Sequence, residues 1–198
     1  MSLEEQTTDK PRTKPAEVRL EELMNAAETL FLDKGFDVTT VSDIVKKAGV
    51  AKGTYYHYFS AKTDVLDALR TRYMDWYLNK IDNAMDACSQ QDHREKLKQW
   101  CEISVIAYVE KQQLHDMLFH QVFHQSSNIH ENRALQQIQT LLIAGTENKT
   151  WHVTQPELTS TLIYHGMHAA VDNLDYSKEY TAKTLGNMLY QQFTQLLK

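Results

Sequence analysis

The sequence predicts an all-α protein, and three observations support this prediction. The 198 residues include only six glycines and three prolines, and no proline falls between Pro15 and Pro156. Together the two residue types make up less than half of their usual combined share of about 12%. Sandwiches and barrels need turn residues every 8–12 positions or so, and this chain does not supply them. Apolar residues instead recur at intervals of three and four, the spacing of one helix face.

Composition and length are those of an ordinary globular protein. Hydrophobic residues make up 42% of the chain and charged residues 24%, enough to bury a core in one domain or two small ones. The N-terminus is polar, and there is no uninterrupted apolar run of about 18 residues, so a cytoplasmic location without a membrane is expected. Cys88 and Cys101 lack a paired-cysteine motif and are expected to be free thiols.

The N-terminal part predicts an arm followed by three helices. Residues 1–16 carry no hydrophobic period, and their basic side chains either touch phosphate or are simply solvated. A first helix should end at Gly35, because glycine accepts the left-handed conformation that ends helices. Thr40 and Asp43 have the spacing of a capping box that opens a second helix. Gly49 then turns the chain into a short third helix, so the spacing is that of a helix-turn-helix.

The rest of the chain predicts longer helices. One holds its apolar period from Lys62 to about Asp86, a length of roughly 37 Å. Further helices follow, separated by a polar break over residues 125–132, and one of them should be closed by Gly145. The last two run from Pro156 to about Asn173 and from about Thr181 to Leu197. We expect three parts: an arm over 1–16, a helix-turn-helix head over 17–62 and a helical body over 63–198.

Charge is distributed unevenly along the head. Four lysines and no acidic residue lie between Lys46 and Lys62, although the formal net charge of the chain is −5. Such a run often marks only a solvated face, but here it surrounds the third helix, whose N-terminal end enters the major groove in helix-turn-helix proteins. Basic groups there would neutralise phosphates, and the acidic remainder would orient the approach.

The head resembles the signature of TetR-family transcriptional regulators over about 45 residues. The matching residues are Leu23-Met24-Asn25-Ala26-Ala27, Leu30-Phe31, Gly35-Phe36, Thr39-Thr40-Val41, Asp43-Ile44, Ala48-Gly49-Val50, Gly53 to Phe59 and Lys62. The resemblance implies a three-helix DNA-binding head, a helical body that binds an effector and dimerises, and usually repression. One departure is Ala51, which stands where serine or threonine is common.

The resemblance implies which residues contact DNA, and the chemistry of the side chains independently favours Lys52, Thr54, Tyr56, His57 and Lys62, whereas Thr40 rests on the resemblance alone. Lysine and threonine side chains can hydrogen-bond base edges or phosphates, whereas Tyr55 and Phe59 are expected to pack in the core. The candidate DNA-binding residues are Thr40, Lys52, Gly53, Thr54, Tyr56, His57 and Lys62.

The last two helices are expected to form a homodimer. Two recognition helices must stand roughly 34–36 Å apart to read a palindromic operator, so something has to join two heads. Together with those of a second copy, these helices would make a four-helix bundle. The alternative is that their apolar stripes are ordinary core faces. The candidate interface residues are Leu158, Leu162, Gly166, Leu185, Leu189 and Phe193.

The body also holds a mixture of apolar and polar residues typical of a ligand pocket, although any one of them could be an ordinary core residue. The candidate ligand-binding residues are Trp100, Tyr108, Phe119, His120, Phe123, Tyr164, Met167 and His168. We expect a small organic effector that displaces the long helix, changes the separation of two heads and weakens operator binding.

The sequence leaves two other functions open besides that of a regulator. His120 and His124 have a metal-chelating spacing, with His115 and Asp116 nearby, but no obvious ligand set is complete, so neither a metal nor a cofactor is expected. A helical metal-binding or enzymatic protein that uses His120, His124 and His168 is the main alternative. An interaction protein that has abandoned DNA is the third possibility, and the lysine-rich head argues against it.

Overall fold

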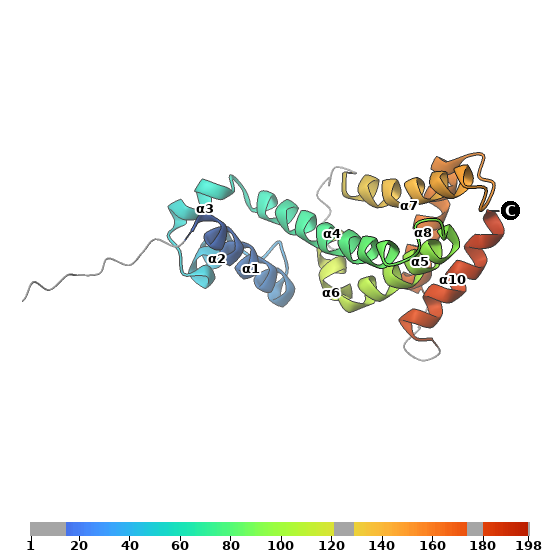
Figure 1. Cartoon of the computed structure of the whole chain (residues 1–198). Helices are drawn as coiled ribbons and strands as arrows, with labels where there is room; N and C mark the ends of the chain where they lie inside the picture. Colours follow the sequence, from blue (N-terminus) through green and yellow to red (C-terminus); the bar gives the residue numbers. More distant parts are fainter. Residues whose placement is uncertain (1–14, 121–128, 174–179, 198) are drawn as a thin grey trace, which may run out of the picture. The chain divides into compact units, whose positions relative to one another are not determined.

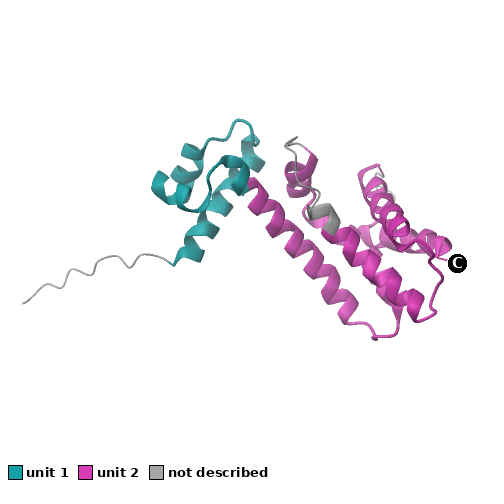
Figure 2. Cartoon of the chain, turned by 90° about the horizontal axis from the view of Figure 1, so that it is seen from above, with its two compact units in different colours: residues 1–65 teal, residues 66–198 magenta. Residues whose placement is uncertain are grey.

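The computed structural model describes residues 15–120, 129–173 and 180–197, and these residues form helices and no strand, as the sequence predicted. The chain divides into two compact units, residues 1–65 and residues 66–198 (Figure 2). The helix α4 (Lys62–Asp86) begins in the first unit and continues into the second. Among the described residues, no helix is long and apolar enough to cross a membrane.

The first unit contains α1 (Ala16–Lys34), α2 (Val41–Ala48) and α3 (Lys52–Tyr58), which Figure 1 draws in blue to cyan. The predicted helix ends are confirmed: Gly35 caps α1, and the Thr40–Asp43 capping box opens α2. Gly49 caps α2 in the left-handed conformation with a φ of 66°, which glycine adopts without steric cost. The turn is tight because the amide of Val50 donates to the carbonyl of Val45.

A small aromatic core holds the three helices together. The rings of Phe31 and Phe36 meet edge to face with their centroids 5.1 Å apart. Tyr55 is fully buried, and its hydroxyl donates to the carbonyl of Ala61 over 3.0 Å. Phe59 is buried against it, as predicted. With these residues inward, the other side of α3 faces solvent.

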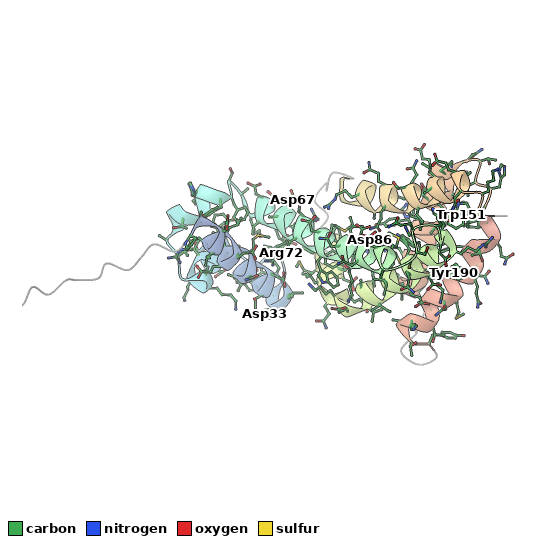
Figure 3. All side chains as sticks on the ribbon, in the orientation of Figure 1. Asp33, Asp67, Arg72, Asp86, Trp151 and Tyr190 are labelled. Carbon is green, nitrogen blue, oxygen red and sulfur yellow. The ribbon has the colours of Figure 1, made fainter. Side chains whose placement is uncertain are left out.

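The second unit contains the body part of α4, along which Figure 3 labels Asp67, Arg72 and Asp86. It continues with α5 (His93–Glu110), the single turn α6 (Gln112–His115) and the π-helix η1 (Asp116–His120). Then follow α7 (Ile129–Glu147), α8 (Pro156–Asn173) and α10 (Ala182–Leu196). The polar break expected over residues 125–132 therefore ends earlier, because α7 begins at Ile129.

The prediction that Gly145 closes a helix is wrong, since α7 continues to Glu147. The glycine serves a different purpose: a Cβ at this position would overlap the indole of Trp151, which is labelled in Figure 3. The indole nitrogen of Trp151 donates to the carbonyl of Leu142 over 2.8 Å. A side chain at position 145 would therefore push away the loop that follows α7.

The helices α10 and α5 pack closely against each other within one chain. A Cβ on Gly186 would lie 2.5 Å from the Cα of Glu102 and 3.0 Å from the carbonyl oxygen of Cys101. The thiol of Cys101 is buried beneath this contact, and burial raises its pKa, whereas Cys88 after the end of α4 is partly exposed. Both thiols are free, as expected.

Because of this packing, three of the residues expected at the dimer interface are buried within one chain. Leu185, Leu189 and Phe193 are buried within a single chain, with exposed fractions of 1%, 9% and 7%. They form a core face, which was the alternative left open by the sequence. Leu158 and Leu162 on α8 are the members of the predicted set that remain more than half exposed.

Candidate DNA-binding surface and body cluster

The capping box fixes Thr40 at the start of α2. The side-chain oxygen of Thr40 accepts from the amide of Asp43, while the carboxylate of Asp43 accepts from the amide and the hydroxyl of Thr40 at 2.9 and 2.8 Å. Lys34 reaches the same carboxylate at 2.8 Å. The hydrogen bond from Lys34 and then those from Thr40 hold the pKa of Asp43 well below its usual range. Thr40 itself stays exposed.

The exposed side of α3 carries most of the predicted DNA-binding residues. Lys52, Gly53 and His57 are exposed, Tyr56 is 52% exposed, and Thr54 is half-buried. The ammonium group of Lys52 lies 6.0 Å from the centroid of the Tyr56 ring. These side chains share one surface because Tyr55 occupies the buried side of the short helix.

A groove runs along this surface between the start of α1 and α3. Arg19, Thr54 and His57 are among the residues that line it, and Tyr58 closes one side by donating to the carbonyl of Ala16 over 3.0 Å. Ala51 provides no side-chain cap for α3, because alanine has no side-chain oxygen that could accept from the first amides of the helix. Arg19, a basic side chain of α1 outside the predicted DNA-binding set, thus joins the surface.

Lys62 occupies a different environment from the other candidates. Its ammonium group donates to the carbonyl oxygens of Phe36, Asp37 and Thr39 at 2.5, 3.2 and 2.8 Å. Burial lowers its pKa from the usual lysine value. The side chain therefore fixes the loop between α1 and α2.

In the body, a cluster of polar and aromatic side chains gathers where α5, α6, η1 and α8 meet. The hydroxyl of Tyr108 lies 2.5 Å from a carboxylate oxygen of Asp172 and 3.3 Å from one of Asp116. Burial, followed by these two carboxylates, raises the pKa of Tyr108 far above its ordinary value. The ring of Tyr108 also lies 4.4 Å from that of His115, centroid to centroid.

Two histidines complete this body cluster, His115, which is buried, and His168, which is half-buried. The rings of His115 and His168 are stacked with centroids 5.7 Å apart, and Tyr164 covers His168 at 4.6 Å. Burial lowers the pKa of both histidines to about 4. Both imidazoles are therefore neutral at neutral pH, and each can donate and accept one hydrogen bond.

The helix α4 contributes Tyr73 to the body cluster. Its ring lies 5.7 Å from that of His115 and 5.8 Å from that of Phe119. The hydroxyl of Tyr73 is buried and has no hydrogen-bond partner among the described residues. Nearby, Arg70 fixes η1 by donating to the carbonyl of Leu118 over 2.9 Å.

The structure thus brings five predicted ligand residues into contact through this cluster: Tyr108, Phe119, His120, Tyr164 and His168. Met167 is fully buried on α8. Trp100 lies apart, since its indole nitrogen donates to Gln137 on α7, next to a separate open groove between α4, α5 and α7. Phe123 and His124 fall outside the described residues.

Sequence reasoning missed some members of the body cluster. Tyr73 looked like one more apolar position of a long helix, and Asp172 carried no signal at all. His115 and Asp116 were noted only as neighbours of a histidine pair. The change from α-helix to π-helix at Asp116 could not be predicted, because it does not alter the spacing of the apolar residues.

Comparisons with known proteins agree with the head and with the fold. Residues 23–69 match the family model described as bacterial regulatory proteins, tetR family. The HTH-type transcriptional repressor KstR2 of Mycolicibacterium smegmatis is 32% identical over 71 residues, which cover 36% of this chain and 35% of the relative. The chain thus aligns with about a third of the length of this curated relative.

Solved structures extend the likeness to nearly the whole chain. The fatty acid degradation regulator FadR from Bacillus halodurans covers 92% of this chain and 96% of its own, with 24% identity and a TM-score of 0.74. FadR from Bacillus subtilis in complex with stearoyl-CoA covers 87% and 96%, with 19% identity and a TM-score of 0.73. Residues 23–69 thus match the tetR family of bacterial regulatory proteins, and the chain as a whole shares the fold of these solved regulators.

Proposed function

We propose that this protein is a sequence-specific DNA-binding repressor, released from a palindromic operator when a small organic effector binds its body. The observation that carries the proposal is the surface of α3, where Lys52, Tyr56 and His57 face solvent while Tyr55 anchors the helix in the core. Repression follows the KstR2 relative, which is named a repressor. The role is one of binding, with no catalytic step.

The DNA contacts proposed for this surface divide by chemistry. Lys52, Thr54, Tyr56 and His57 lie on α3, which is the element that reads the major groove in helix-turn-helix proteins. Gly53 lets the backbone of α3 approach the duplex closely. A Cβ at this position would meet no other protein atom and would project outward into the space proposed for DNA. Thr40 and Lys62 would contact phosphates, and the hydrogen bonds of Lys62 indicate that it also positions the loop.

The body cluster is the proposed effector site. It offers three tyrosine hydroxyls, two neutral imidazoles and aromatic faces, the mixture of apolar surface and a few polar groups that ligand pockets use. The carboxylates of Asp116 and Asp172 favour a neutral or cationic part of the effector at this point, since a further negative charge would be repelled. The stearoyl-CoA complex of the FadR neighbour makes acyl-CoA thioesters the first probes.

Coupling between effector and operator would run through α4. Tyr73 lies on this helix and contacts His115 and Phe119. An effector that rearranges these side chains would therefore change the position of α4. The unpartnered hydroxyl of Tyr73 offers one direct hydrogen bond for such an effector. Displacement of α4 would then change the separation of two heads, provided the effector binds the two arrangements with different affinities.

The dimer that a palindrome requires is proposed to form through exposed residues of α8 and α10. Leu158 and Leu162 on α8 are 53% and 54% exposed, and Met188 and Leu196 on α10 are 38% and 52% exposed. Contiguous exposed apolar patches mark interaction surfaces, and these four side chains are proposed to form one. Gly166 would support this arrangement from within, because Phe193 packs against it.

Selection of bound fragments from a random DNA pool tests the DNA-binding part directly. We expect a palindrome to be enriched, with binding that weakens steeply as salt rises. Lys52→Ala and Tyr56→Ala should each weaken binding to that palindrome by roughly five- to a hundredfold. Lys98→Ala on α5 is the matched control and should bind normally. Enrichment of no sequence over bulk DNA would overturn the proposal.

A further inference from the structure

A second kind of site is built where α6 passes into η1. His115 and His120 both present Nδ1 to the same carboxylate oxygen of Asp116, at 3.4 Å in each case. One donor atom from each of these three residues lies within 4.8 Å of the other two. The three side chains thus converge on a single point.

The π-helix explains why two histidines five positions apart can converge. Five residues of an α-helix turn through about 140° beyond a full turn, which would send the rings to different sides. A π-helix hydrogen-bonds residues five apart and therefore sets them nearly above one another. The ring centroids of His115 and His120 are accordingly only 5.0 Å apart. Rare single turns of this kind occur frequently at functional sites.

The distances suit a metal ion better than hydrogen bonds alone. Hydrogen bonds from nitrogen to oxygen usually span about 2.7–3.2 Å, so 3.4 Å is long for two such bonds. Donor atoms that lie about 2.0–2.1 Å from a tetrahedral ion are separated from one another by roughly 3.4 Å. Two of the three donor pairs already have this separation.

The surroundings resemble those of an open metal site. The hydroxyl of Tyr108, 3.3 Å from the Asp116 carboxylate, orients it in the way that outer hydrogen bonds orient metal-binding carboxylates. His115 is buried and fixed by Tyr108, while the side chain of His120 is 48% exposed and leaves a path for entry. Three protein ligands leave at least one coordination position for water or for another molecule.

We propose that His115, Asp116 and His120 bind a divalent first-row transition ion of the zinc and cobalt type. Two imidazoles among three ligands select such ions over magnesium and calcium, which prefer oxygen. The ion would join α6 and η1 within the body cluster, which is also the proposed effector site. The inference rests on these three side chains alone and holds whether or not the chain binds an operator.

Titration of the untagged 198-residue chain with Zn²⁺ after chelator treatment tests this proposal, with Co²⁺ as a coloured probe. We expect one ion per chain and the intense visible absorption of tetrahedral Co²⁺. Asp116→Asn keeps the shape of the side chain and His120→Ala removes an exposed ring, so neither should unfold the body, yet each should weaken binding about tenfold or more. His152→Ala, an exposed histidine in the loop before α8, is the control and should bind as wild type.

Zinc binding that Asp116→Asn and His120→Ala leave unchanged would overturn the proposal, as would the absence of binding. Circular dichroism of each variant without metal shows whether the fold is retained. Operator selection is run separately on the metal-free chain, so failure of the metal site and failure of the regulatory function are told apart.

Discussion

The ammonium group of Lys62 lies 2.5 Å from the carbonyl oxygen of Phe36 and 4.1 Å from the centroid of the same residue's ring. Lys62 thus contacts both the backbone and the side chain of Phe36, a residue of the loop between α1 and α2. Two further carbonyls, of Asp37 and Thr39, complete its contacts. The loop delivers Thr40 to the start of α2, so Lys62 positions a predicted DNA contact in addition to any contact of its own.

Lys62→Met should therefore destabilise the protein. The substitution keeps the length of the side chain but leaves three carbonyls without their charged donor, which should lower the free energy of unfolding by about 1–3 kcal/mol. Lys52→Met changes an exposed lysine and should stay within about 0.5 kcal/mol of wild type. Urea denaturation of both variants measures the difference. Equal stability of the two would contradict the positioning role.

Gly186→Ala should destabilise the body. The added methyl would meet the backbone of Glu102 on α5, which cannot rotate away as a side chain can. Overpacking of this kind costs about 1–3 kcal/mol. Gly53→Ala is the contrasting variant, because nothing lies within 4 Å of its Cβ, and there the gain in helix propensity should raise stability by up to about 1 kcal/mol. Thermal denaturation should show a melting temperature below that of the wild type for Gly186→Ala and above it for Gly53→Ala.

Gly53→Ala should nevertheless weaken DNA binding. Its methyl would project into the space where the backbone of α3 is proposed to approach the duplex. A fluorescence anisotropy titration with the selected palindrome measures this effect. A variant that is more stable yet binds as tightly as wild type would remove Gly53 from the interface.

Tyr73→Phe should stabilise the unliganded protein. The hydroxyl of Tyr73 is buried without a partner among the described residues, and leaving such a group unpaired costs about 1–3 kcal/mol. Its removal should raise the melting temperature while weakening the binding of any effector that pairs with it. Thermal shifts with a panel of acyl-CoA thioesters follow both effects in one experiment. A loss of stability would mean that the hydroxyl already has a partner in the free protein.

His115 and His168 of the body cluster should make stability depend on pH. His115 and His168 have pKa values of about 4 in the folded chain, below the ordinary value of 6.5. A histidine with a depressed pKa gives its full stabilisation above the unfolded value, and this is lost as pH falls from 6.5 towards 4 because the unfolded state takes up the proton first. One such group would cost about 2 kcal/mol at pH 5 relative to pH 7.5.

Urea denaturation at these two pH values, with a chelator present, checks this expectation. His168→Gln should reduce the difference between pH 7.5 and pH 5, whereas His152→Gln in an exposed loop should leave it unchanged. A wild-type stability that is the same at both pH values would mean that the two histidines are not buried as neutral groups.

Leu162→Arg should turn a dimer into a monomer if α8 lies at the interface. The side chain is 54% exposed in the single chain, so a charged replacement costs little in folding but would be buried unpaired in a dimer. Light scattering after size-exclusion chromatography gives the mass directly. Leu32→Arg, at a 43% exposed leucine on α1, is the control for a lost apolar surface. Dimers of normal mass for Leu162→Arg would place the interface elsewhere.

The head could be predicted from the sequence almost residue by residue, since its signals are local. The glycine at 35, the Thr40–Asp43 capping box and the left-handed Gly49 each end or begin a helix through interactions a few residues long. Tyr55 and Phe59 could be assigned to the core because the helix is short and has only one buried side.

The body could be predicted only in outline. The stripe of Leu185, Leu189 and Phe193 has the same period whether it packs on α5 of its own chain or on a second copy, so the period could not distinguish the two. The close approach of Gly186 to Glu102 decides the matter, and such long-range contacts leave no local pattern. The π-turn that aligns His115 with His120 was equally hidden.

The different exposure of the two cysteines allows one of them to be labelled selectively. Cys101 is sealed beneath α10, and burial raises its pKa, so it should resist alkylation, while Cys88 is the partly open thiol. A maleimide spin label should therefore attach at one place per chain, without prior mutagenesis. In a dimer, pulsed resonance spectroscopy would then read a single distance between two copies, which can be followed as candidate effectors are added.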